Sequence, residues 1–167
     1  MLWLQTALFL IMPFCLIFSF FHDLATLTIP NWISILLAAS FLPLALVSGM
    51  GLTDIALHYG FGIIALGLGI LLFALKIMGG GDSKLIAALG VWLGWKLFLP
   101  FLLIMAIAGG ALSLAILLAR KRWQGERPVR FRWLAEGIFT GGKVPYGVAI
   151  AIGGLYLVSH YSVYPQF

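Results

Sequence analysis

Two aspartates, Asp23 and Asp82, lie beside long apolar stretches of this 167-residue sequence. Only five side chains in the whole chain carry a carboxyl group. A carboxylate close to hydrocarbon is costly in free energy, so it indicates a functional site that contains a partner group. The partner of Asp23 could be Asp82, because two carboxyl groups that share a proton can hydrolyse a peptide bond without a metal.

A run of three glycines, Gly79 to Gly81, stands directly before Asp82. Glycine adopts backbone conformations that other residues avoid, and it lets another chain approach closely. An extended substrate backbone could therefore reach Asp82. The alternative is a flexible turn in which Asp82 caps the following helix, since aspartate is a favoured N-cap residue. Asp23 alone is less informative, because a polar residue is common just after an apolar span.

Other catalytic or metal-binding chemistries find little support in the sequence. The three histidines, His22, His58 and His160, fall on opposite sides of the predicted membrane, so no cluster with the spacing of metal ligands forms. The one cysteine, Cys15, lies inside an apolar stretch and is expected to be a small core residue. A serine nucleophile at Ser83 would have only His22 as a nearby base.

The three remaining acids have simpler explanations in local structure. Asp54 is expected to cap the helix that it begins. Glu126 and Glu136 lie among arginines and are expected to form ion pairs. The pair of Asp23 and Asp82 is therefore the best candidate for catalysis.

The composition places these residues in a membrane. The chain is 63% hydrophobic and 9% charged, with a mean hydropathy of +1.13, which is typical of a polytopic membrane protein. The N-terminus lacks the basic region and cleavage site of a signal peptide, so its first apolar stretch is expected to be retained. We expect one transmembrane domain over residues 1–167, without an added cytoplasmic zinc or methyltransferase domain.

Six apolar stretches are expected to cross the membrane as helices and to form a single all-α bundle. A straight helix needs about 20 residues to span the hydrocarbon layer. Joining the fourth and fifth stretches would give about 36 residues with Pro100 inside, which is too long for one crossing and is interrupted by the proline. The expected spans are residues 2–21, 32–47, 55–75, 83–98, 100–119 and 145–160.

The basic residues predict the orientation. The net charge of +5 could indicate nucleic-acid binding, but nine of the ten lysines and arginines fall in the two loops at residues 76–84 and 120–143, and only Lys96 lies opposite. The positive-inside rule makes that face cytoplasmic, which leaves both termini outside. Asp23 and Asp82 then lie together at the cytoplasmic face of the cell inner membrane.

Three segments resemble the type IV prepilin peptidase family, which contains GxGD aspartic peptidases. The family's GxGDxK segment is matched by Gly79-Gly80-Gly81-Asp82-Ser83-Lys84. Its first catalytic aspartate and the start of its second helix are matched by Asp23 and Ile29-Pro30-Asn31. The start of its last helix is matched by Lys143-Val144-Pro145-Tyr146-Gly147. The resemblance is closest to the small members from tight-adherence (Flp-type) pilus systems.

The resemblance implies that Asp23 and Asp82 form the catalytic dyad of a prepilin leader peptidase. One ionised carboxylate would take a proton from water, and the other carboxyl group would protonate the scissile carbonyl oxygen. Gly79 and Gly81 are expected to admit the substrate. Lys84 could steer a substrate carboxylate, tune Asp82, or anchor its helix at the membrane interface. The expected partners are a prepilin or pseudopilin and membrane lipid, with no nucleic acid, cofactor or metal.

Two other functions remain open from the sequence. A non-enzymatic proton-coupled transporter or pilus-assembly subunit could use the aspartates as a relay, although a proton path should place acids at several depths. A presenilin-like protease would use the same chemistry, but it usually has a Tyr-Asp context in a longer chain. Larger family members carry an added cytoplasmic domain and also perform methyl transfer. Because we expect no such domain in this chain, we expect hydrolysis without methyl transfer. The oligomeric state is left open.

Overall fold

The computed structural model describes residues 2–122, 138 and 144–160, and the elements in this part of the chain are helices. The prediction of an all-α chain is confirmed. The acids at positions 126 and 136 and most of the basic loop lie outside the described residues. The helices are α1 (Leu2–Thr26), α2 (Asn31–Val47), α3 (Leu52–Ala74), α4 (Gly80–Arg122) and α6 (Tyr146–His160).

Three of these helices, α1, α3 and α4, are long and apolar enough to cross a membrane. The other two, α2 and α6, are apolar but shorter, with 17 and 15 residues. Large apolar side chains cover the outside of the bundle, and Trp3, Leu52 and Ile107 are 90%, 77% and 73% exposed. Apolar surface on this scale fits contact with lipid rather than water. The chain therefore has the character of a helical membrane protein.

The break predicted near Pro100 is wrong. Pro100 lies inside α4, and the helix is interrupted instead at Gly94, where φ is 57° and ψ is −173°. Glycine adopts this positive φ readily because it has no Cβ. The His58 ring fills the space beside the break, where a Cβ on Gly94 would lie 2.8 Å from its Cε1 atom. The ring also donates a 2.7 Å hydrogen bond from Nδ1 to the carbonyl oxygen of Val91, near the end of the first part of the helix.

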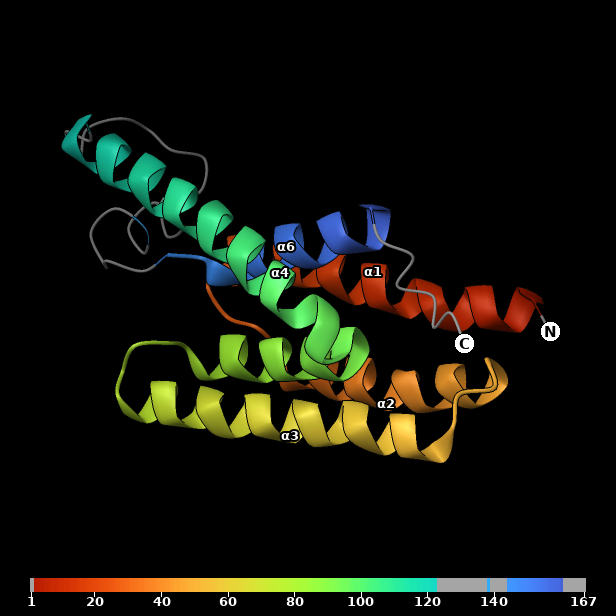
Figure 1. Ribbon diagram of the computed structural model, residues 1–167. Helices are drawn as coiled ribbons and strands as arrows, with labels where there is room; N and C mark the ends of the chain where they lie inside the picture. Colours follow the sequence, from red (N-terminus) through yellow and green to blue (C-terminus); the bar gives the residue numbers. More distant parts are fainter. Residues whose placement is uncertain (1, 123–137, 139–143, 161–167) are drawn as a thin grey trace.

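The break divides α4 into a first arm (residues 80–93) and a second arm (residues 95–122). Figure 1 shows the first arm beside α3 and the second arm turned back toward the end of the molecule at which α4 begins. The start of α1 and the end of α6 lie at the opposite end (Figure 1). This arrangement of helix ends is the one that the predicted topology requires. The number of membrane crossings and the side that each end faces stay predictions.

The first arm of α4 lies at the centre of the bundle. It contacts α2 and α3, and α4 as a whole also contacts α6. Small residues allow α3 to approach closely, since a Cβ on Gly62 would overlap a Val91 methyl group and one on Gly69 would lie 2.9 Å from the Ser83 Cβ. On the other side, the indole of Trp92 donates a 2.6 Å hydrogen bond to a backbone carbonyl of α2. These contacts fix where the start of α4 sits.

Candidate active site

Asp23 is buried near the C-terminal end of α1, where only 4% of its surface is exposed. Its Oδ2 atom accepts a 2.7 Å hydrogen bond from the backbone N–H of Gly147, the second residue of α6. The first N–H groups of a helix have no partner within the helix, and the positive end of the helix dipole favours a negative group there. Asp23 therefore joins the end of α1 to the start of α6.

The close approach of the two helices requires glycine at position 147. A Cβ atom at this position would lie 2.9 Å from both the Cβ and the Oδ2 atoms of Asp23, closer than real Cβ contacts. The Pro-Tyr-Gly segment thus has a physical role that sequence reasoning missed, because the segment was identified by resemblance and not as a partner of Asp23. The only signal in the sequence was a glycine at the start of an apolar helix.

Asp82 is half-buried and lies at the third position of α4. It accepts a hydrogen bond from the backbone of Gly79, the residue before the helix. A side chain at this position that reaches back to the N-cap N–H is one half of a capping box. A Cβ on Gly79 would lie 2.6 Å from the Asp82 Oδ2 atom, so the carboxyl group needs glycine at this position. Asp82 therefore helps to begin its own helix, as the simpler interpretation of the sequence predicted.

The two aspartates come together in space although they are far apart in the sequence. The charge of Asp23 acts on the carboxyl group of Asp82, so the two groups lie within electrostatic range of each other. Each carboxyl group also receives an N–H from the start of a helix, Asp23 from α6 and Asp82 from α4. The helix ends favour negative charge, whereas two adjacent carboxylates repel each other. The two helix starts and the opposing carboxyl group therefore act on the charge of Asp82 in opposite directions.

Gly81 has a different neighbour from the one that the sequence suggested. A Cβ on Gly81 would lie 3.1 Å from the Cβ and 3.2 Å from the carbonyl oxygen of Ile29, in the connection between α1 and α2. The glycine thus makes room for the chain's own backbone. Gly80 faces the ring of Phe73, with its nearest atom at 3.3 Å. A ring can move aside more easily than a backbone, so Gly81 is the more constrained of the two.

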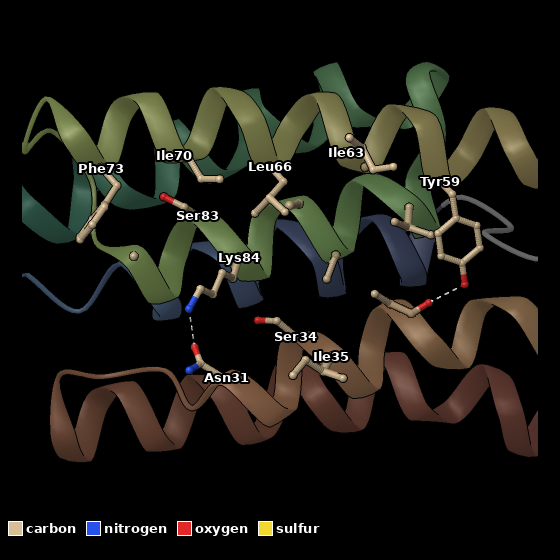
Figure 2. Close-up of a pocket in the computed structure, with 16 residues that line it drawn as sticks. Asn31, Ser34, Ile35, Tyr59, Ile63, Leu66, Ile70, Phe73, Ser83 and Lys84 are labelled. Atoms are coloured by element: carbon tan, nitrogen blue, oxygen red, sulfur yellow. Dashed lines mark hydrogen bonds between the residues drawn. The ribbon is translucent and has the colours of Figure 1, made fainter.

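Lys84 links two of the segments on which the resemblance rests. Its Nζ atom donates a 2.8 Å hydrogen bond to Oδ1 of Asn31 at the start of α2 (Figure 2). Lys84 thus bonds to a side-chain amide. From the sequence, we expected it to interact with a carboxylate or to anchor its helix at the membrane interface. The bond holds the start of α2 against the start of α4, two residues after Asp82 in the chain.

One polar residue near the pair was not identified from the sequence. Ser19 lies one helical turn before Asp23 on the same face of α1 and is completely buried. Its hydroxyl has no hydrogen-bond partner among the residues that the structure describes. Within the same residues, no three histidine, cysteine, aspartate or glutamate side chains are grouped so that they could hold a metal ion. The two carboxyl groups are of a kind that can transfer protons to and from water.

Comparison with known proteins identifies the family to which this sequence is similar. The family model described as "Type IV leader peptidase family" matches residues 10–114, more than half of the chain, and this range includes both aspartates. A protein of Burkholderia pseudomallei (strain 1026b) named "Prepilin leader peptidase/N-methyltransferase" is 44% identical over 68 residues, which are 40% of this chain and 22% of the relative. Relatives of the same name from Aeromonas hydrophila and Pectobacterium carotovorum subsp. carotovorum extend the comparison.

The Aeromonas relative is 32% identical over 77 residues, which are 46% of this chain and 21% of the relative. The Pectobacterium relative is 40% identical over 63 residues, which are 37% of this chain and 22% of the relative. The chain thus matches about a fifth of the length of each curated relative. No solved structure matches this chain.

Proposed function

This chain belongs to the type IV leader peptidase family, and we propose that it is an aspartic endopeptidase that removes the leader from a type IV prepilin or pseudopilin. The names of its relatives support the substrate class. The observation that carries the proposal is the pairing of two carboxyl groups, from α1 and α4, within electrostatic range of each other. Such a pair can provide both the base and the acid of peptide hydrolysis.

In the proposed reaction, the ionised carboxylate removes a proton from a water molecule while the water oxygen attacks the scissile carbonyl carbon. The protonated carboxyl group donates its proton to the carbonyl oxygen, which gives a neutral tetrahedral intermediate. The intermediate collapses as the C–N bond breaks: one carboxyl group passes its proton to the leaving amine, and the other carboxylate takes a proton from a hydroxyl of the intermediate. The pair then again holds one proton. The two groups titrate together, so base and acid are roles of the pair.

The surroundings of the two carboxyl groups support their proposed roles as base and acid. The N–H of Gly147 holds one oxygen of Asp23 at 2.7 Å, which leaves the other oxygen available for water. Asp82 is less buried than Asp23 and can be approached from outside the bundle. The starts of α4 and α6 both favour the single negative charge that the resting pair must hold.

We further propose that the pair works at the cytoplasmic face of the cell inner membrane, in a Flp-type pilus system. The grouping of basic residues near the start of α4 and in the loop after α4 supports this orientation. A prepilin with a basic leader in the cytoplasm and an apolar helix in the bilayer has its cleavage site at the boundary. A pair of acids near the helix ends suits a cut at that depth.

The test is the conversion of each acid to its amide. Asp23→Asn and Asp82→Asn should each lower cleavage of a co-expressed prepilin by at least about a hundredfold, because an amide keeps the shape but cannot transfer the proton. Both variants should still accumulate in the membrane. The control is Asp54→Asn, which changes an exposed acid in the first turn of α3 and should keep normal cleavage. Near-normal cleavage by either dyad variant would remove that residue from the mechanism.

A further inference from the structure

A groove runs between α2 and α3, with the first arm of α4 as its base. α2 and α3 each pack against α4 but make few contacts with one another. The space between them has a volume of about 770 Å³ and is lined mainly by apolar side chains of the three helices (Figure 2). Its edges carry exposed isoleucines, with Ile35, Ile63 and Ile70 at 67%, 69% and 58% exposure.

The two ends of the groove differ. At one end the hydroxyl of Tyr59 donates a 2.8 Å hydrogen bond to the carbonyl oxygen of Ala38, which ties α3 to α2 and closes the space. At the other end lie Gly80 and Lys84, on either side of Asp82 in the sequence. Figure 2 shows Lys84 and Tyr59 at these opposite ends. The groove therefore leads from a closed apolar end to the start of α4, the turn of helix that also contains Asp82.

A buried hydroxyl group, that of Ser34, faces the groove. The side chain of Ser34 lines the groove and is only 7% exposed, and its hydroxyl has no hydrogen-bond partner among the described residues. Figure 2 shows this hydroxyl directed into the space between α2 and α4. A buried hydroxyl without a hydrogen bond is unfavourable, so such groups usually have a partner. A lipid tail offers no donor or acceptor, whereas a polypeptide does.

We propose that this groove holds the apolar helix of the prepilin substrate, with the polar leader at the Lys84 end, where α4 begins. This inference rests on the proposed function. The lining between Tyr59 and Phe73 extends about 21 Å along α3, at about 1.5 Å for each residue of a helix. A helix about 10 Å wide and of that length fills about 1,600 Å³, so the groove encloses about half of it. One side of the substrate helix lies in the groove, and the other faces lipid.

The experiment compares two neighbouring positions on α3 in the full chain, held in membranes with a co-expressed prepilin. A photoreactive residue replaces either Ile63, which lines the groove, or Ile64, which is similarly exposed at 61% but lies outside it. The Asp82→Asn substitution in both proteins keeps the substrate uncleaved. Position 63 should capture the prepilin through its apolar segment with at least a tenfold higher yield than position 64. Equal yields, or capture of lipid alone at position 63, would overturn the proposal.

A second measurement tests the hydroxyl of Ser34 in purified protein. Ser34→Ala should raise the prepilin concentration needed for half-maximal capture by about fivefold, the effect of one hydrogen bond. It should not lower the melting temperature without substrate, because it removes a buried hydroxyl that bonds to none of the described residues. Ser40→Ala is the control, since Ser40 is also buried on α2 but bonds to its own helix at Leu37. A Ser34 variant that captures prepilin as well as the Ser40 variant does would refute the role of the hydroxyl.

Capture and cleavage fail independently, so the two proposals can be told apart. Cleavage by the unaltered protein without capture at Ile63 would overturn the groove and leave the peptidase. Capture at Ile63 without cleavage by the unaltered protein would keep the groove and overturn the peptidase.

Discussion

Replacement of Gly147 by alanine tests whether the contact between α1 and α6 positions a catalytic group. The added methyl carbon would begin 2.9 Å from the Cβ and Oδ2 atoms of Asp23. Carbon atoms in favourable contact are about 3.5–4.0 Å apart, so the helices must separate locally by about 0.6–1.1 Å. Added to the present length of 2.7 Å, this shift would stretch the hydrogen bond from the Gly147 N–H to at least about 3.3 Å, beyond the usual range.

The expected consequences differ for stability and for activity. Overpacking of this kind lowers the free energy of unfolding by about 1–3 kcal/mol. A displacement of about 1 Å at a catalytic group can lower the rate by about a hundredfold. We therefore expect Gly147→Ala to accumulate and to melt at a moderately lower temperature, but to cleave prepilin about a hundred times more slowly. Cleavage of a co-expressed prepilin and thermal melting in detergent measure the two effects.

The control for this experiment is Gly67→Ala on α3. A Cβ at Gly67 meets no atom within 4 Å, so the substitution should leave cleavage unchanged and should stabilise the helix by up to about 1 kcal/mol. If Asp23 only caps α6, the cleavage lost in Gly147→Ala should match the fraction of protein that unfolds. Full cleavage and unchanged melting in Gly147→Ala would refute the reasoning altogether.

Two further predictions concern the glycine run and the orientation. Gly81→Ala should lower cleavage by at least about tenfold, or about 1.4 kcal/mol in the barrier, because its methyl group would press on the backbone of Ile29. Gly80→Ala should be tolerated better, since its methyl group would meet a ring that can move. Equal and full activity in both variants would contradict this prediction. In a cysteine-free background, Leu52→Cys should react with an impermeant thiol reagent outside intact cells and Ile77→Cys should not, although both sites are exposed. Labelling at position 77 from outside would reverse the orientation.

Much of the architecture could be predicted from composition and spacing. Apolar stretches bounded by polar, glycine or proline residues predicted the helices, and α2 and α6 begin and end within one residue of the predicted spans. The scarcity of acids directed attention to Asp23 and Asp82, and the distribution of basic residues predicted that both lie on one side. These properties depend on the partition of side chains between water and hydrocarbon, which each residue type largely determines for itself.

The break in α4 depended on tertiary structure. A proline is the stronger local signal for a helix break, yet Pro100 lies inside the helix and the chain turns at Gly94. Proline is tolerated in membrane helices where neighbouring groups compensate for the lost hydrogen bond. The turn at Gly94 is supported by His58 from α3, which fills the space and binds the carbonyl oxygen of Val91. Nothing in the linear sequence pairs position 58 with position 94.

The surroundings of the two aspartates were also decided by packing. The sequence predicted the acids and the glycines near them. It could not show that Gly147 contacts Asp23, that Gly81 contacts Ile29, or that a groove ends at Gly80 and Lys84. Such contacts depend on which helices become neighbours and on how closely their backbones approach. Both depend on the close packing of the whole bundle, in which residues that are distant in the sequence contact one another.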